Sequence, residues 1–248
     1  MISVVSLGVI VGVLNLNNNI NALNNNKIED QEVTKGITII KELEAQDVLE
    51  SEEKIELVQK GLQGINTNKN NGEVDFVDKF SSSVILGDSR AESIVLYEIL
   101  NSSSIVAYKG RNLITAQKEG DIDTAINLVP KNIFLTYGLN DTGIYGNPSD
   151  FIKEYEKIIK YIQNRLPNTK IYVNSIFNVS NGALAKQPYF KTISQFNVAI
   201  LDMCNRLGLT YIDGSSIVDS SLYEVDGVHF KPQFNKNWLK LLIEKANL

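Results

Sequence analysis

Short apolar runs alternate with longer amphipathic stretches from about Val74 to the C-terminus. Short runs rich in β-branched and aromatic residues predict strands, whereas apolar residues that recur every three or four positions predict helices. The predicted strands are Ser83–Leu86, Ser104–Ala107, Asn132–Tyr137, Lys170–Ile176 and Leu209–Ile212. The predicted helices are Ala91–Leu100, Ile122–Leu128, Pro148–Leu166, Phe190–Leu207 and Lys236–Ala246. This alternation indicates an α/β domain in which helices cover both faces of a five-stranded parallel sheet.

The residues before that domain follow a different pattern. Met1–Leu14 is almost entirely apolar, no Lys or Arg precedes it, and it is shorter than the ~20 residues of a membrane-spanning helix. We interpret it as an export or membrane-anchoring segment, and a longer leader is one explanation for the absence of a basic end. The alternative is a short apolar terminus that packs on the protein. Asn15–Asn26 is two-thirds asparagine and predicts a disordered spacer.

Residues 27–73 are strongly charged and carry only a thin apolar stripe, which predicts a helical extension that ends in a polar linker. The chain is therefore divided into a leader and spacer over 1–26, the charged extension over 27–73 and a folded domain over 74–248. The leader predicts a protein that acts outside the cytoplasm, either secreted or attached to a membrane through its N-terminus.

Composition argues against several classes of partner and cofactor. The chain has 248 residues and a formal net charge of −5, without a block of Lys or Arg, so we expect no nucleic-acid partner. Cys204 is the only cysteine, which precludes an intrachain disulfide and predicts a small buried apolar side chain in a helix. No Cys/His cluster has the spacing of metal ligands, and we expect neither a metal nor another cofactor. The composition does not indicate an oligomeric state.

Candidate site residues follow each of the first three predicted strands, at the edge where parallel sheets bind their ligands. Ser89 follows the first strand at the start of a helix, where a hydroxyl suits a nucleophile and where a serine equally well caps the helix. Gly110 follows the second strand and can offer an unobstructed backbone N–H. Asn140 follows the third strand and can donate its amide to an oxyanion, although Asn-Asp after a glycine is also a common turn.

His229 is the only histidine in the chain and follows the fifth strand. Histidine is the usual general base near neutral pH, and Asp226 lies three residues earlier, where a carboxylate can hold the useful tautomer. A buried histidine with satisfied hydrogen bonds is the alternative. A nucleophile, oxyanion donors and an oriented base in this order together favour acyl-transfer chemistry.

These residues resemble the four sequence blocks of the SGNH/GDSL hydrolase superfamily. The matching segments are Gly87-Asp88-Ser89, Gly110, Gly138-x-Asn140 and Asp226-x-x-His229, and the resemblance extends from about Val84 to the C-terminus. It implies a three-layer, doubly wound flavodoxin-like fold and a catalytic triad of Ser89, Asp226 and His229. It also implies an oxyanion hole formed by the backbone N–H groups of Ser89 and Gly110 and by the amide of Asn140.

The chain departs from the pattern of that superfamily after two of the blocks. Arg90 follows the serine where Leu, Ile or Thr is usual, and Arg111-Asn112 follows Gly110 where the pattern continues as Gly-x-Ser/Gly. We interpret Arg90 and Arg111 either as contacts for an anionic substrate group or as ion-pair residues beside the site. Tyr145, together with Phe177 and Tyr189, is predicted either to form a sugar-stacking platform or acyl wall or to pin its loop to the core.

The resemblance implies a serine esterase, since superfamily members hydrolyse esters, often acetyl groups on carbohydrate. With the leader, it predicts an enzyme that removes acetyl groups from cell-envelope or extracellular carbohydrate. One alternative is an O-acetyltransferase that uses the same triad to pass the acyl group to a sugar. Another alternative is a non-catalytic surface binding protein on the same fold.

Overall fold

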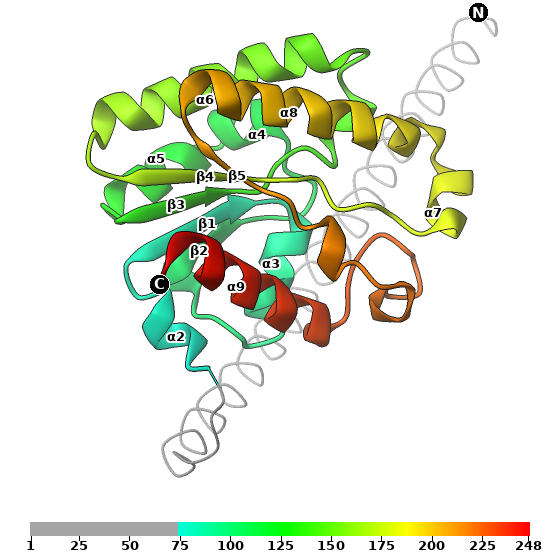
Figure 1. Cartoon of the computed structure of the whole chain (residues 1–248), viewed down its shortest axis with the longest axis horizontal. Helices are drawn as coiled ribbons and strands as arrows, with labels where there is room; N and C mark the ends of the chain where they lie inside the picture. Colours follow the sequence, from blue (N-terminus) through cyan, green and yellow to red (C-terminus); the bar gives the residue numbers. More distant parts are fainter. Residues whose placement is uncertain (1–73) are drawn as a thin grey trace, which may run out of the picture. The chain divides into compact units, whose positions relative to one another are not determined.

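The computed structural model of this chain describes residues 74–248 (Figure 1). The leader, the spacer and the charged extension predicted for residues 1–73 lie outside the described residues. Among residues 74–248, no helix combines the length and the apolar character needed to cross a membrane.

The domain is built on a sheet of five parallel strands in the order β2-β1-β3-β4-β5. The strands are β1 (Ser83–Gly87), β2 (Ile105–Ala107), β3 (Asn132–Leu135), β4 (Lys170–Asn174) and β5 (Thr210–Ile212). This is the flavodoxin-like order, and it confirms the predicted doubly wound sheet. The order reverses between β1 and β3, so the loops that follow these two neighbouring strands turn to opposite faces and leave a crevice at their carboxyl ends.

Side chains of the strands alternate between two apolar layers. In β1, Val84 and Leu86 face one layer, whereas Ile85 faces the other. The first layer contains α4 (Leu113–Lys118), α5 (Asp121–Asn127), α6 (Pro148–Arg165) and α8 (Ile193–Leu207). The second contains α2 (Phe76–Lys79), α3 (Ser89–Leu96) and α9 (Pro232–Ala246). Figure 1 shows these two sets of helices on opposite faces of the sheet.

Among residues 74–248 the longest helix is α6, which begins at the predicted Pro148 and ends at Arg165, one residue before the predicted Leu166. Asn147 caps it, because its side-chain oxygen accepts from the backbone N–H of Asp150 at 3.2 Å, and Pro148 occupies the first helical position. The apolar residues Phe151, Ile158 and Ile162 lie on one face and are fully or almost fully buried. That face packs on α8 and on the sheet, which is why the amphipathic pattern was readable from sequence alone.

Three short helices, α2, α4 and α7, were not predicted. α4 has six residues and is capped by Asn112, whose side chain accepts from the backbone N–H groups of Ile114 and Thr115, both at 3.0 Å. α7 (Asn181–Lys186) also has six residues and is capped by Ser180, whose Oγ accepts from the backbone N–H of Ala183 at 3.2 Å. Fewer than two helical turns leave too few positions for a periodic pattern, so their caps and tertiary contacts determine these helices.

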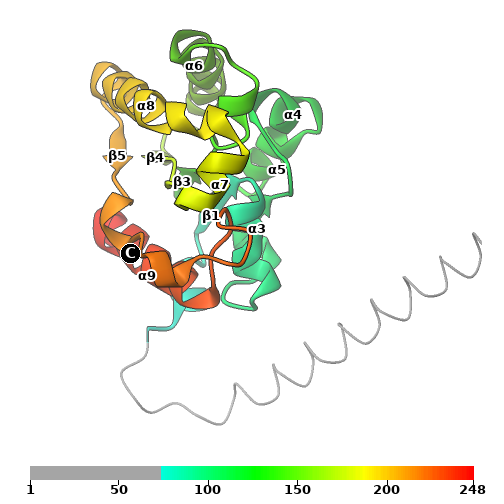
Figure 2. The same ribbon diagram turned by 90° about the vertical axis from the view of Figure 1, so that its right-hand side faces the viewer.

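Loops at the carboxyl ends of the strands form one end of the domain. Figure 2 views the domain from this side, where α7 and the segment that precedes α9 lie near the start of α3. Gly138, just after β3, has φ +136°, and a Cβ there would lie 2.5 Å from the side chain of Ile176. Only glycine adopts this conformation without strain, so Gly138 permits the close approach of the loops after β3 and β4.

Candidate active site

Ser89 is the first residue of α3, and only Asp88 separates it from the end of β1. Asp88 caps the helix, because its Oδ1 accepts from the backbone N–H of Arg90 at 2.9 Å. The serine side chain is half-buried at the helix N-terminus, where the helix dipole favours negative charge. The position therefore suits a hydroxyl that becomes negatively charged during a reaction.

The fold brings Ser89 into contact with the lone histidine. Ser89 Oγ lies 2.8 Å from Nε2 of His229, although the two residues are 140 positions apart in the chain. Nδ1 of the same ring lies 2.6 Å from Oδ2 of Asp226. When Nδ1–H donates to the carboxylate, Nε2 is free to accept the hydroxyl proton of Ser89. This is the nucleophile–base–carboxylate arrangement used in acyl transfer.

Asp226 is held in place by its own loop. Its Oδ1 accepts from the backbone N–H groups of Val228 at 2.8 Å and His229 at 2.9 Å. Burial alone would raise the pKa of Asp226, but these hydrogen bonds and the one from the His229 ring lower it to about 2. The carboxylate is consequently ionised over the whole range in which an imidazole works as a base.

The backbone of the histidine loop, residues 226–229, is tied to its surroundings. Gly227 has φ +71°, and a Cβ there would lie 1.9 Å from Ser180 Oγ, so this position requires glycine. The backbone N–H of Ser180 donates to the carbonyl of Gly227 at 2.8 Å. The backbone N–H of Glu224 donates to the carbonyl of His229, also at 2.8 Å. These contacts attach the loop both to α7 and to the chain that precedes it.

Asn140 follows β3 and lies against the segment that follows β2. Its amide Nδ2 donates to the carbonyl of Arg111 at 2.8 Å, which fixes the side chain and leaves the second N–H of the amide for another acceptor. Gly110 lies next to this carbonyl in the sequence, is exposed, and has φ +76°. The structure therefore links the two predicted oxyanion segments through one hydrogen bond.

The two arginines singled out in the sequence have different surroundings. Arg90 is buried, and its guanidinium donates to three backbone carbonyls rather than reaching the solvent. Arg111 forms a two-pronged ion pair with Asp121, with Nε at 2.7 Å from Oδ2 and Nη2 at 3.3 Å from Oδ1. These contacts favour the ion-pair and positioning interpretation over a contact with substrate, because both guanidinium groups already have partners.

The three aromatic residues proposed for the loops also differ. Phe177 is 4% exposed and packs edge-on against Phe234 and Trp238, so it belongs to the core and is not a stacking platform. Tyr145 is half-buried, packs edge-on against Phe151 and thus pins its loop to the core. Tyr189 is 42% exposed and remains the aromatic ring of the three that presents most of its surface to solvent.

Asp141 is a buried carboxyl group, although Asn-Asp after a glycine in the sequence is equally typical of a turn. Its Oδ1 accepts from the backbone N–H of Leu113 at 3.0 Å, which joins the loop after β3 to the start of α4. Its Oδ2 is buried and has no hydrogen-bond partner among residues 74–248. Burial raises the pKa of Asp141 to about 7. The one signal in the sequence for a carboxyl group beside the site is that Asp141 directly follows Asn140, a candidate oxyanion donor.

The raised pKa of Asp141 predicts a pH-dependent stability. An unfolded Asp titrates near pH 4, so between about pH 4 and 7 the folded protein binds more protons and its free energy of unfolding falls as the pH rises. Asp141→Asn removes this loss while the amide oxygen still accepts from Leu113. We expect Asp141→Asn to be more stable than the wild type by about 1 to 4 kcal/mol at pH 8 and little changed at pH 4.

Urea unfolding at both pH values measures this difference, with the exposed Asp202→Asn as a control that changes the same charge. If Asp141→Asn changes the free energy of unfolding equally at pH 4 and pH 8, the raised pKa of Asp141 is contradicted. A difference of the opposite sign at pH 8 contradicts it as well.

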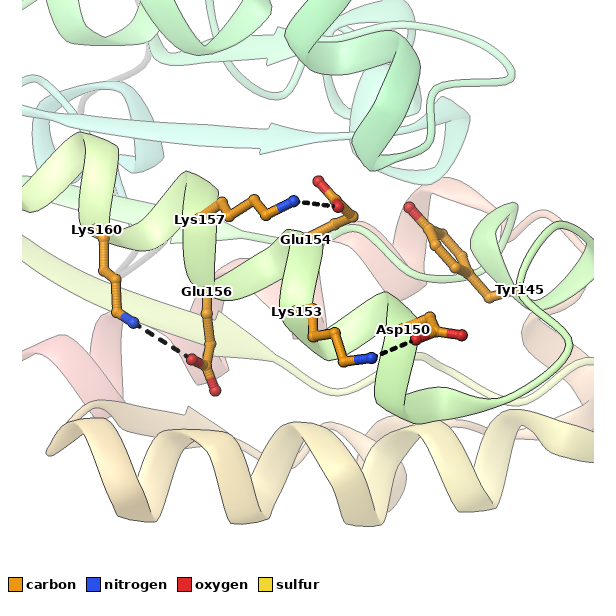
Figure 3. A pocket seen from close by; sticks show the side chains of 7 residues that line it. All are labelled: Tyr145, Asp150, Lys153, Glu154, Glu156, Lys157 and Lys160. Carbon is orange, nitrogen blue, oxygen red and sulfur yellow. Dashed lines mark hydrogen bonds and ion pairs between the residues drawn. The ribbon is translucent and has the colours of Figure 1, made fainter.

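A surface depression of about 490 Å³ lies along the exposed side of α6 (Figure 3). Its lining residues are Tyr145, Asp150, Lys153, Glu154, Glu156, Lys157 and Lys160. The charged side chains pair with each other along the helix, as Lys153 does with Asp150 at 2.7 Å. Exposed pairs of this kind stabilise a helix only slightly, and no residue of the Ser89 site lines the depression. We therefore assign it no part in the chemistry.

No group of three or more His, Cys, Asp or Glu side chains within residues 74–248 is arranged to hold a metal ion. Cys204 is fully buried in α8, and burial raises the pKa of its thiol to about 12. The thiol is therefore an apolar packing group, as predicted for a helix interior.

Comparison with known proteins identifies the family. The sequence matches the GDSL-like lipase/acylhydrolase family over residues 83–236, which is more than half of the chain. No curated protein sequence matches it.

Solved structures share the fold at low sequence identity. A GDSL-like lipase from Bacteroides thetaiotaomicron aligns with a TM-score of 0.52 and 16% identity, covering 70% of this chain and 93% of the other. A lipase/acylhydrolase from Enterococcus faecalis gives a TM-score of 0.52 and 15% identity, covering 67% of this chain and 96% of the other. A carbohydrate esterase of family 3 from Talaromyces cellulolyticus gives 0.50 and 18%, covering 67% and 98%. The chain belongs to the GDSL-like lipase/acylhydrolase family, which implies hydrolase activity.

Proposed function

We propose that this protein is a serine esterase that removes small acyl groups, above all acetyl, from a carbohydrate carrier. The observation that carries the proposal is the contact of Ser89 Oγ with Nε2 of His229 at 2.8 Å, with Asp226 on the other ring nitrogen at 2.6 Å. A hydroxyl, a neutral imidazole and an ionised carboxylate in this order make a nucleophile available near neutral pH.

The reaction begins with attack of Ser89 Oγ on the ester carbonyl while Nε2 of His229 takes the hydroxyl proton. The carbonyl oxygen gains negative charge, which the helix N-terminus at Ser89, the free amide N–H of Asn140 and the backbone N–H of Gly110 stabilise. Collapse of this intermediate breaks the bond to the alcohol, which leaves with the proton from His229. Water then attacks the acyl-serine by the same route, with His229 again as base, and releases the carboxylic acid.

The exposure of the site supports a bulky carrier with a small acyl group. The side chain of His229 is 36% exposed and that of Asp226 is 50% exposed, so the base and its carboxylate lie at the surface of the domain. A substrate that reaches this site can extend away from it into solvent, which suits a sugar chain better than a ligand enclosed in a deep pocket. The carbohydrate esterase with the same fold is consistent with this carrier. We further infer, from the apolar leader, that the enzyme acts outside the cytoplasm.

A fluorophosphonate probe tests the covalent step directly. We expect one probe molecule per chain, attached to Ser89, when the labelled protein is digested and analysed by mass spectrometry. Labelling that is absent, or that occurs equally at other serines, contradicts the proposed nucleophile. A non-catalytic surface protein predicts no labelling.

Substrate turnover tests the acyl group and its acceptor. We expect p-nitrophenyl acetate to be hydrolysed at least ~10-fold faster than the octanoate ester, since a long acyl chain gains little at a site whose base and carboxylate are exposed to solvent. With an acetylated oligosaccharide as donor, free acetate is the expected product. If acetylated sugar acceptor accumulates in preference to acetate, the enzyme is an O-acetyltransferase rather than an esterase.

A further inference from the structure

We propose that Arg90 is a positioning residue, which clamps the histidine loop and the loop after β4 to the helix that carries Ser89. The inference rests on the proposed function, because it assigns Arg90 the task of holding His229 in line with the nucleophile. It also accounts for the residue at which this chain departs from the usual pattern after the serine.

The guanidinium of Arg90 reaches two loops at once. Nε donates to the carbonyl of Val228 at 3.0 Å. Nη1 donates to the carbonyl of Phe177 at 2.7 Å, and Nη2 to the carbonyl of Asn178 at 3.2 Å. The guanidinium carbon also lies 5.0 Å from the centre of the Phe230 ring, over its face. One side chain thus joins α3 to segments that are 87, 88 and 138 positions away.

The contact with Val228 bears on the base. Val228 directly precedes His229. The carbonyl of Val228 that accepts from Arg90 and the backbone nitrogen of His229 therefore belong to the same peptide group. Phe230, on the other side of the histidine, is the ring that the guanidinium covers. The histidine is therefore held on both sides by the residue next to the nucleophile. A shift of this loop changes the distance between Ser89 Oγ and Nε2, and displacements of about 1 Å can cost on the order of 100-fold in rate.

The burial of this charge indicates a specific task. Arg90 is 5% exposed, and an isolated buried cation is unfavourable unless its donors are hydrogen-bonded. If the side chain at position 90 only filled space in the core, an aliphatic residue would fill it equally well. The planar fork of arginine instead places three donors at fixed angles, which matches three carbonyls from two loops. Lysine has the charge but lacks this geometry.

Arg111 provides a comparison, because it is an arginine beside the site that does not contact these two loops. It follows Gly110, pairs with Asp121 ten positions later in the chain, and its side chain is 23% exposed. Its guanidinium lies over Tyr108, 5.0 Å from the ring centre. The contacts of its guanidinium remain within the segment between β2 and β3, whereas those of the Arg90 guanidinium connect distant parts of the domain.

The test compares Arg90→Met and Arg90→Lys with Ile200→Ala, a cavity-forming change in the core of α8 that leaves the site untouched. We expect Arg90→Met to lower kcat for p-nitrophenyl acetate by about 10- to 100-fold with KM changed less than about 3-fold. Arg90→Lys is expected to lie between Arg90→Met and the wild type. Ile200→Ala is expected to keep its kcat at a comparable loss in Tm.

A nuclear magnetic resonance measurement gives a readout that does not depend on turnover. Because His229 is the only histidine, protein labelled with 15N-histidine gives one set of imidazole signals. In the wild type we expect a single Nδ1–H tautomer with sharp signals. In Arg90→Met we expect broadened or doubled signals, since the ring samples more than one position, whereas Ile200→Ala should leave them as in the wild type.

Each result decides the proposal. An Arg90→Met protein with wild-type kcat and unchanged imidazole signals overturns it, and so does a loss that appears in KM alone, which would indicate contact with substrate. If Arg90→Met does not fold, Arg90→Lys carries the comparison, and wild-type rate and signals in that variant overturn the proposal. If the wild type has no esterase activity, the proposed function fails, while the imidazole signals still show whether Arg90 positions the ring.

Discussion

Replacing Ser89 by alanine is expected to lower the turnover of p-nitrophenyl acetate by a factor on the order of 10⁴ to 10⁶. The variant loses the oxygen that lies 2.8 Å from His229 and that would form the acyl-enzyme. Nothing in its fold should change, because the backbone N–H groups of the helix N-terminus and the cap at Asp88 remain. Steady-state kinetics and the thermal unfolding curve of the same preparation measure the two properties side by side.

His229→Ala and the double variant make this prediction sharper. Residues that act as a unit have non-additive effects, so the double variant should be little slower than Ser89→Ala alone. Ser103→Ala is the matched control, since Ser103 is an exposed serine in the short helix before β2. If Ser89→Ala keeps more than about a tenth of the wild-type rate while Ser103→Ala is unaffected, another group is the nucleophile.

Replacing Asn140 by alanine is expected to lower kcat by about 100- to 1,000-fold with little change in KM. The amide N–H that is not used for the Arg111 carbonyl is the donor we assign to the oxyanion, and this charge exists only in the transition state. Asn140→Asp should be at least as damaging, because it replaces a donor by a negative charge where negative charge develops.

Asn140 also joins two loops, so its structural contribution needs a separate control. Asn197→Ala provides one, since Asn197 likewise holds a backbone segment, donating to the carbonyl of Ile176 at 2.9 Å and accepting from its N–H at 2.7 Å. We expect Asn197→Ala to lose stability without the large loss of kcat. An equal loss of kcat in both variants would mean that loop anchoring, and not oxyanion stabilisation, explains the effect of Asn140.

The sheet and its principal helices could be predicted because the periodic pattern of apolar residues within each segment indicates its secondary structure. Successive side chains of β1 point to opposite faces of the sheet, which places Ile85 against one helical layer and Val84 against the other. This alternation does not depend on the conformation of the loops. The end of β3 was predicted two residues too late, at Tyr137 instead of Leu135. Tyr137 is apolar enough to extend the strand pattern, but the chain has already left the sheet to place Gly138 and Asn140.

The contrast between Arg90 and Arg111 shows where local information ends. Both follow a strand and adjoin a candidate site residue, so their roles cannot be distinguished from the sequence. Their roles separate only through partners: three carbonyls at least 87 positions away for Arg90, and one carboxylate ten positions away for Arg111. A strand pattern carries no information about which distant carbonyl a guanidinium will meet.

By itself the sequence determined the order of the reactive groups and the strand that each one follows. This was enough to predict a shared site, since the carboxyl ends of parallel strands meet at one edge of the sheet. The tertiary structure decided the distances, with Ser89 2.8 Å from His229, and it decided that Arg90 faces inward and that Asp141 is buried. Those outcomes depend on how loops from distant parts of the chain pack against each other, and such packing leaves no periodic trace in the sequence.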